Sequence, residues 1–325
     1  MKALICKEHG LADKLELVGD WPEPELGDKE VLIKVKAASL NFPDVLMIQG
    51  KYQMQPDLPF VTGGECAGIV EAVGSAVKRY KVGDEVIFAG GVGAFAEKVA
   101  ANENLVAPKP SALSFEQAAG VSIAYFTSYH ALKQRANLAA GETLLVLGAA
   151  GGVGTTAIEL GKQMGARVIA AASSEEKLAL CRQLGADDTI NYSEVSLKDA
   201  IKELTDGKGV DVVYDPVGGD FSEAALRGMA WNGRYLVIGF ASGPIPKIPL
   251  NLTLLKGCSI VGVFWGRFTM EEPEENLTNI KELWALFESG KIAPVVNDCF
   301  ALEDYEKAFD TMISRRARGK VILTI

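Results

Sequence analysis

The sequence predicts an α/β protein in which a doubly wound parallel sheet is inserted into a β-rich domain. Three observations support this fold class. Short apolar runs divided by proline and glycine fill the first third of the chain, an alternation of apolar run, turn and helical pattern begins near residue 142, and the chain ends in another short apolar run. A length of 325 residues suits two domains. We expect the β-rich domain at residues 1–122 and 267–325, and the parallel-sheet domain at residues 123–266.

The β-rich domain is inferred from short strands between turn residues. Prolines such as Pro43 and Pro59, together with frequent glycine, interrupt the apolar runs, as in an irregular barrel or sandwich. The expected strands are residues 31–37, 68–73, 85–88 and 95–99, with a helix at 276–289 and a last strand at 320–325.

The parallel-sheet domain is inferred from a change in the pattern of apolar residues along the chain. Residues 143–147 (TLLVL) form a continuous apolar run typical of a strand buried on both faces, and residues 153–164 have helical spacing. Such alternation predicts a parallel sheet covered by helices on both faces. Further strands are expected at residues 167–171, 189–192, 210–214, 235–238 and 260–265, and further helices at 175–184, 197–204 and 221–231.

Composition excludes several classes of protein. The net charge is −9 and no basic run could follow a phosphate backbone, so nucleic acid is not expected as the main partner. No apolar stretch approaches the ~20 residues of a membrane helix, and the apolar start is too short for a signal peptide, which predicts a cytoplasmic protein. Five dispersed cysteines and two histidines predict neither a disulfide framework nor a cysteine-rich zinc site.

A glycine-rich turn lies between the first parallel strand and its helix. The string GAAGGVG at residues 148–154 follows the strand directly and opens the helix. Glycine permits a tight turn and close approach of the backbone to a pyrophosphate, while the helix N-terminus offers unpaired N–H groups. In this strand–turn–helix context the string predicts a dinucleotide site.

The end of the next strand indicates which dinucleotide binds. Ala172 stands where an NAD site usually has a carboxylate, whereas Ser173, Ser174 and Lys177 can donate to a 2′-phosphate. Ser174 is also a suitable helix cap, and the acidic pair at residues 175–176 counts against a phosphate site. On balance these residues predict NADPH as the cofactor.

With these motifs the sequence resembles the medium-chain dehydrogenase/reductase superfamily, in the zinc-free quinone oxidoreductase branch that includes zeta-crystallin. The resemblance covers the whole chain and implies a Rossmann NADPH-binding domain inserted into a GroES-like catalytic domain. It rests on the strings NFPD (41–44), GKY (50–52), GGECAG (63–68), GDEV (83–86), AAGGVG (149–154), DPVGG (215–219) and GK (319–320).

The sequence departs from the zinc-dependent branch at the metal ligands. That branch has a cysteine where Asn41 stands and a Gly-His-Glu string where Gly63, Gly64 and Glu65 stand, and its four-cysteine lobe has no counterpart after Phe88. An amide and a glycine cannot replace a thiolate and an imidazole. We therefore expect no catalytic and no structural zinc, and we expect the nearby Cys66 to be a buried core residue.

The resemblance also implies positions for substrate and cofactor. Asn41 would lie near the nicotinamide and Tyr52 near the substrate, although Tyr52 could instead be a turn aromatic, and Asp44 and His130 are expected to be structural. Phe264 and Trp265 could instead be interface or core residues. The implied cofactor contacts are Asn41 and Thr127 for the nicotinamide half, Ala150, Gly151, Gly152 and Val153 for the pyrophosphate, Ser173, Ser174, Lys177 and Tyr192 for the 2′-phosphate, Gly239, Phe240, Phe264, Trp265 and Gly266 for the nicotinamide ribose and ring, and Arg318 near the C-terminus.

The implied activity is NADPH-dependent reduction of a quinone or an α,β-unsaturated carbonyl. No Ser-Tyr-Lys or His-Asp proton relay is evident, so an acceptor that needs little acid catalysis is expected, with Asn41 and Tyr52 orienting its carbonyl and water supplying the proton. An enoyl-thioester reductase would need a basic groove, for which Arg267 is the one obvious cation, and a low-turnover crystallin-like NADPH-binding protein is the other alternative. The apolar strand at residues 260–265, which the family places at a sheet edge, predicts a homodimer.

Overall fold

The computed structural model describes residues 1–325, which divide into two compact units. Unit 1 comprises Met1–Ile123 and Phe287–Ile325, and unit 2 comprises Ala124–Leu286. Unit 2 is therefore inserted into the sequence of unit 1. Its end differs from the expectation, because residues 267–286 group with the parallel sheet and not with the β-rich unit.

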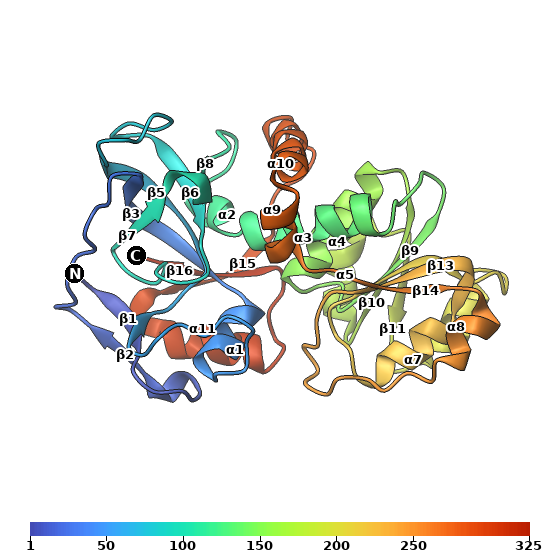
Figure 1. Cartoon of the computed structure of the whole chain (residues 1–325). Helices are drawn as coiled ribbons and strands as arrows, with labels where there is room; N and C mark the ends of the chain where they lie inside the picture. Colours follow the sequence, from blue (N-terminus) through green and yellow to red (C-terminus); the bar gives the residue numbers. More distant parts are fainter. The chain divides into compact units, whose positions relative to one another are not determined.

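Unit 1 is built on a sheet of seven strands in the order β15-β16-β3-β5-β6-β8, with β7 paired to β3. Its C-terminal strand β16 pairs antiparallel with β3, so Figure 1 shows the red end of the chain within a sheet of blue and cyan strands. This pairing returns the chain to unit 1 after the insertion. The strands are β3 (Glu30–Leu40), β5 (Glu65–Val73), β6 (Glu85–Ala89), β7 (Lys98–Asn102), β8 (Val106–Pro108), β15 (Val296–Ala301) and β16 (Lys320–Thr324).

A second sheet in unit 1 has the order β2-β1-β4 and was not foreseen from the sequence. It consists of β1 (Ala3–Cys6), β2 (Leu15–Val18) and β4 (Phe60–Val61). The strand expected at residues 95–99 is wrong in position, since β7 begins at Lys98. Phe95 instead accepts a backbone hydrogen bond from Leu4 at 2.9 Å, and Ala96 bridges to Ala3, so this segment connects β1 to the larger sheet.

Three helices complete unit 1: α1 (Phe42–Ile48), α2 (Phe115–Ala119) and α11 (Tyr305–Ile313). Phe309 on α11 is fully buried and packs edge-on against Phe95, with ring centroids 6.5 Å apart. Cys66 is also fully buried within this apolar core, as expected.

Unit 2 is a six-stranded sheet in the order β11-β10-β9-β12-β13-β14, in which all neighbours are parallel. The central strand β9 is the run TLLVL, and four of its five residues are buried, which confirms a strand covered on both faces. The strands are β9 (Thr143–Leu147), β10 (Arg167–Ala172), β11 (Asp188–Asn191), β12 (Val210–Asp215), β13 (Met229–Val237) and β14 (Ser259–Gly262), and the helices are α3 (Ser122–His130, beginning in unit 1), α4 (Gly152–Gln163), α5 (Glu175–Gln183), α6 (Leu197–Leu204), α7 (Asp220–Arg227), α8 (Asn251–Lys256), α9 (Trp265–Glu271) and α10 (Pro273–Glu288, ending in unit 1).

Two expected elements of unit 2 are too long. The helix expected at residues 221–231 ends at Arg227, because Gly228 caps it and Met229 already begins β13. The strand expected at 260–265 ends at Gly262, and Trp265 opens α9 instead. In both cases apolar residues continue across a change of secondary structure, so periodicity alone does not show the boundary.

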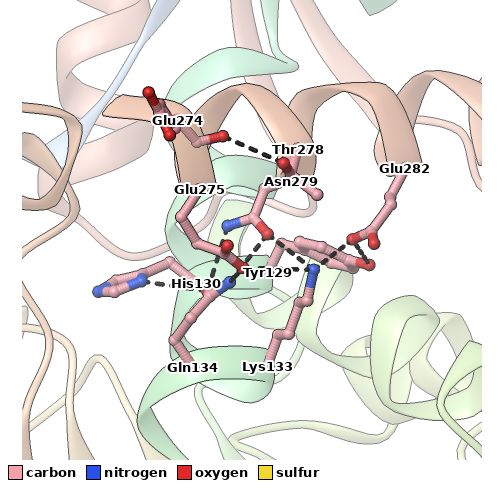
Figure 2. A network of polar contacts seen from close by, with 9 residues as sticks. All are labelled: Tyr129, His130, Lys133, Gln134, Glu274, Glu275, Thr278, Asn279 and Glu282. Carbon is pink, nitrogen blue, oxygen red and sulfur yellow. Dashed lines mark hydrogen bonds and ion pairs between the residues drawn. The ribbon is translucent and has the colours of Figure 1, made fainter. Parts of the chain in front are cut away.

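A polar network attaches α10 to α3 and to the π-helical turn Ala131–Arg135 that continues it (Figure 2). The amide oxygen of the buried Asn279 accepts hydrogen bonds from Lys133 Nζ at 3.1 Å and Gln134 Nε2 at 2.8 Å. Glu282 accepts one from Lys133 Nζ at 2.5 Å. All of these side chains belong to unit 2, which is why this helical segment folds with the parallel sheet.

His130 lies at the end of α3 and is buried. Its ring stacks on Phe268 of α9 with centroids 3.9 Å apart, and Nδ1 lies 3.2 Å from the side-chain oxygen of Gln134. Burial is the main cause that lowers the pKa of His130. These contacts give His130 a packing role.

Candidate functional site

The glycine turn between β9 and α4 is sterically restricted to glycine. A Cβ on Gly154 would lie 2.4 Å from the carbonyl oxygen of Gly148, and Gly148 itself has a φ of +57°. The helix begins at Gly152 without a side-chain cap and without an acidic residue in its first turn. Its first N–H groups therefore remain available, and a helix N-terminus of this kind binds phosphate. This is where Ala150, Gly151, Gly152 and Val153 lie.

The four residues expected around a 2′-phosphate lie close together at the end of β10. Ser174 caps α5, and Lys177 on its first turn donates from Nζ to Ser173 Oγ at 3.2 Å. Tyr192 follows β11 and donates its backbone N–H to Ala172 at 3.2 Å. The acidic neighbour Glu175 forms an ion pair with Arg182 at the surface.

The loop after β13 carries Gly239 and Phe240 and lies against the DPVGG turn. Asp215 stabilises that turn, because its Oδ1 accepts the backbone N–H groups of Val217 at 2.7 Å and Gly218 at 2.9 Å. A Cβ on Gly218 would lie 2.9 Å from the ring of Phe240, which places the two loops in contact. The side chain of Asp215 is therefore engaged in holding the loop.

The segment Phe264, Trp265 and Gly266 begins α9. Phe264 is 54% exposed, whereas the Trp265 ring packs against Phe126 of α3 at 5.6 Å between centroids. Trp265 Nε1 also donates to Asn276 at 3.3 Å. Thr127 follows Phe126 on α3 and is partly exposed. Trp265 is thus fixed by packing within unit 2, and Phe264 is not.

In unit 1, Asn41 belongs to a buried polar cluster. We use this name for Asn41, Asp44, Glu65 and Lys320, all of which are 6% exposed or less. The Asn41 backbone N–H donates to Asp44 Oδ2 at 2.7 Å, and its side-chain Nδ2 donates to Glu65 Oε1 at 2.9 Å and to the carbonyl of Ser39 at 3.2 Å. Both amide protons are engaged, so the side chain has no N–H left to orient a substrate carbonyl.

Lys320 and Glu65 complete the cluster. Lys320 Nζ donates to Asn41 Oδ1 at 2.5 Å and lies 3.1 Å from Glu65 Oε1, while Glu65 Oε2 accepts the backbone N–H of Ile123 at 2.8 Å. The sequence placed both residues in family strings but assigned them no role. One sequence signal could have found them: each is a charged residue in a strand whose adjacent residues are buried and apolar.

Asp44 and Tyr52 differ from the rest of the site in their protonation chemistry. Burial raises the pKa of Asp44 to about 7, against the opposing hydrogen bond from the Asn41 backbone N–H. Burial, and after it the charge of Asp44, raises the pKa of Tyr52. The Tyr52 ring packs on the core of unit 1, and its hydroxyl makes no hydrogen bond within the chain. Tyr52 is therefore an available donor in unit 1.

Arg318 stands just before β16, and its backbone N–H lies 3.5 Å from Asp298 Oδ2.

The donor set around Asn41 does not suit zinc. Gly64 has no side chain, Glu65 already binds Lys320, and the thiol of Cys66 lies in the apolar core, where burial raises its pKa. Zinc in proteins prefers thiolate, imidazole and carboxylate ligands in a tetrahedral set, which these residues do not provide.

Comparisons with known proteins agree with this geometry. Residues 27–111 match the family model described as alcohol dehydrogenase GroES-like domain, and residues 152–282 match that of zinc-binding dehydrogenase. The chain is 39% identical to the "Quinone oxidoreductase-like protein 2 homolog" of Nematostella vectensis, over 99% of this chain and 88% of the relative. It is 40% identical to a quinone oxidoreductase of Pseudomonas aeruginosa, over 94% of each protein. The solved structure of Escherichia coli quinone oxidoreductase complexed with NADPH is 32% identical, with a TM-score of 0.93 and full coverage of both chains. The chain belongs to the medium-chain dehydrogenase/reductase superfamily, in its quinone oxidoreductase branch.

Proposed function

We propose that this protein is an NADPH-dependent oxidoreductase that reduces a quinone or an α,β-unsaturated carbonyl without zinc. The observation that carries the cofactor choice is the Lys177–Ser173 contact at the end of β10, where Ala172 replaces the carboxylate of an NAD site. The relatives named quinone oxidoreductase and the solved NADPH complex support the same choice.

The residues present fit the cofactor. The glycine turn lets a pyrophosphate approach its backbone closely. Lys177 and its serine neighbours supply hydrogen-bond donors for a 2′-phosphate. NADPH, when bound, supplies the hydride. The residues proposed to hold it are Asn41, Thr127, Ala150, Gly151, Gly152, Val153, Ser173, Ser174, Lys177, Tyr192, Gly239, Phe240, Phe264, Trp265, Gly266 and Arg318.

For the acceptor, we assign the orienting hydrogen bond to the Tyr52 hydroxyl, with water as the source of the proton. Asn41 is less suited to that task because its amide protons are engaged by Glu65 and Ser39. Arg267, the one cation named for the enoyl-thioester alternative, pairs with Glu271 at 3.1 Å, so a carboxylate competes with a CoA phosphate for it. No helix is both long and apolar enough to cross a membrane. The cytoplasmic location and the homodimer expected from the sequence stay predictions.

The cofactor proposal predicts the effect of Lys177→Ala. Loss of a charge-assisted hydrogen bond to the 2′-phosphate should raise the KM for NADPH by roughly 10- to 100-fold and leave the KM for NADH unchanged. Steady-state kinetics with 1,4-benzoquinone measure both constants. Turnover of benzoquinone, a simple enone and crotonyl-CoA by the parent protein then compares the acceptor classes.

Lys162→Ala is the matched control. Lys162 is a half-exposed lysine near the end of helix α4 in unit 2. Its Nζ pairs with Asp187 at 2.7 Å. This variant should leave both cofactor constants unchanged. If the KM for NADPH stays the same in Lys177→Ala, the assigned 2′-phosphate site is wrong. If the parent protein turns over none of the acceptors, the proposed oxidoreductase activity is wrong.

A further inference from the structure

Three buried hydroxyl groups in unit 2 contact one another beside the proposed cofactor site. They belong to Ser128 of α3, Thr156 of α4 and Tyr214 of β12, each of which is 1% exposed or less. Ser128 Oγ lies 2.7 Å from Thr156 Oγ1 and 2.7 Å from the Tyr214 hydroxyl. Burying a hydroxyl is costly unless it forms hydrogen bonds, and these three satisfy one another. We call them the hydroxyl network.

The contact distances assign a direction to the three protons. Thr156 Oγ1 donates to the carbonyl oxygen of Val153 at 2.9 Å, which leaves it to accept from Ser128, whose Oγ lies farther from that carbonyl at 3.3 Å. Ser128 has then used its single proton and accepts from Tyr214. Burial raises the pKa of Tyr214, so its hydroxyl keeps the proton that it donates. The network therefore runs from β12 through α3 to a carbonyl in the first turn of α4.

We propose that the hydroxyl network positions the three segments that hold the pyrophosphate and the nicotinamide half of the cofactor. Each member adjoins one of these segments. The α3 member follows Thr127, the α4 member bonds to Val153, and the β12 member directly precedes Asp215, which holds the DPVGG turn. The hydroxyls of α3 and β12 are 86 residues apart in the sequence, so no hydrogen bond within one element sets the spacing of these segments.

The network does not extend to the proposed 2′-phosphate contacts. Those contacts lie at the end of β10 and on α5, whereas every hydrogen bond of the network joins α3, α4 and β12. The pyrophosphate and nicotinamide contacts should therefore depend on the network, and the 2′-phosphate contacts should not. This inference rests on the proposed function, because the site that it concerns is the NADPH site.

Binding of the cofactor and of a cofactor fragment tests this separation without turnover. Tyr214→Phe and Thr156→Val each remove one hydroxyl and nearly keep the side-chain volume, and they alter different elements, so either can decide if the other does not fold. We expect the Kd for NADPH, measured by isothermal titration calorimetry, to rise by roughly fivefold to tenfold in each. The Kd for adenosine 2′-phosphate, which lacks the pyrophosphate and the nicotinamide, should not change. Thr156→Ser keeps the hydroxyl and should bind NADPH like the parent.

Thr205→Val is the matched control for loss of a buried hydroxyl. Thr205 follows α6 in unit 2 and is 6% exposed. Its Oγ1 donates to the carbonyl of Ile201 at 2.7 Å and accepts the backbone N–H of Gly209 at 2.9 Å, and neither partner belongs to the proposed site. This variant should lower the melting temperature about as much as the network variants do, and it should leave the Kd for NADPH unchanged.

Lys177→Ala distinguishes failure of this inference from failure of the proposed function. It removes a 2′-phosphate contact and should weaken NADPH and adenosine 2′-phosphate alike. If it does so while Tyr214→Phe and Thr156→Val bind NADPH like the parent, the network is only structural and the inference is wrong, although the proposed function stands. An equal loss of both ligands in the network variants also overturns the inference. A parent protein that does not bind NADPH overturns the proposed function and this inference with it.

Discussion

Asp44 is a buried carboxyl whose charge is only partly compensated by its surroundings. Its partners are backbone N–H groups and the more distant ammonium of Lys320, while the nearby Glu65 adds a charge of the same sign. Burial raises the pKa of Asp44 to about 7, above the value near 3.9 of an unfolded chain. The folded protein therefore binds this proton more tightly than the unfolded chain does.

The pH dependence of stability follows from that difference. Between about pH 4 and pH 7 the folded state holds the Asp44 proton and the unfolded state has lost it, so this group makes the free energy of unfolding fall as pH rises. Asp44→Asn removes the dependence. We expect the stability of this variant relative to the parent to rise by about 2 to 3 kcal/mol between pH 5 and pH 8, as measured by urea unfolding.

Asp28→Asn serves as the control, because Asp28 is exposed and its partner is the exposed hydroxyl of Ser75. Its stability relative to the parent should not change over the same range. If the parent and Asp44→Asn follow parallel stability curves from pH 5 to pH 8, the raised pKa of Asp44 is wrong.

At the scale of secondary-structure elements, polar side-chain contacts attach α10 to the π-helical turn Ala131–Arg135 that continues α3. Asn279 makes three side-chain hydrogen bonds, accepting from Lys133 and Gln134 and donating to the Gln134 side-chain oxygen at 3.1 Å (Figure 2). Asn279→Ala removes these hydrogen bonds from the half-buried side chains of Lys133 and Gln134, at a cost of about 1 to 2 kcal/mol. We expect faster hydrogen–deuterium exchange in α10, with exchange in β9 unchanged.

Thr278→Ala is the neighbouring control. Thr278 is exposed, and its hydroxyl reaches only the carbonyl of Glu274 in its own helix. This variant should exchange like the parent. Equal exchange of α10 in Asn279→Ala and in the parent would show that the network does not attach the helix.

Elements fixed by local pattern could be predicted from the sequence. The bounds of β9 agree with the expectation because a strand buried on both faces has an uninterrupted apolar run, and the glycine turn was predicted because all its determinants are neighbours. The contact of Lys320 with Glu65 spans 255 residues, and no local pattern reports such a pairing. The contact of the Asn41 amide with Glu65, 24 residues away, could not be foreseen for the same reason.

At the scale of the whole molecule, one edge of the parallel sheet carries exposed apolar surface. β14 is the outermost strand, and Ile260 on it is 41% exposed. Large exposed side chains stand on neighbouring segments, namely Trp231 on β13, Leu254 and Leu255 on α8, and Leu250 just before it. An unpaired apolar strand edge beside an apolar patch favours association with another chain.

A second copy of the chain is the partner that this edge predicts. In a two-fold dimer the same patch faces itself, so β14 would pair with β14 of the other copy and the two sheets would become continuous.

Ile260→Asp places a charge in that contact, and we expect a parent dimer to become a monomer by light scattering at micromolar concentration. Val82→Asp changes an equally apolar residue that is 63% exposed in unit 1, far along the sequence from β14, and should leave the dimer intact. A monomeric parent protein, or an Ile260→Asp variant that stays dimeric, would show that association does not use this edge.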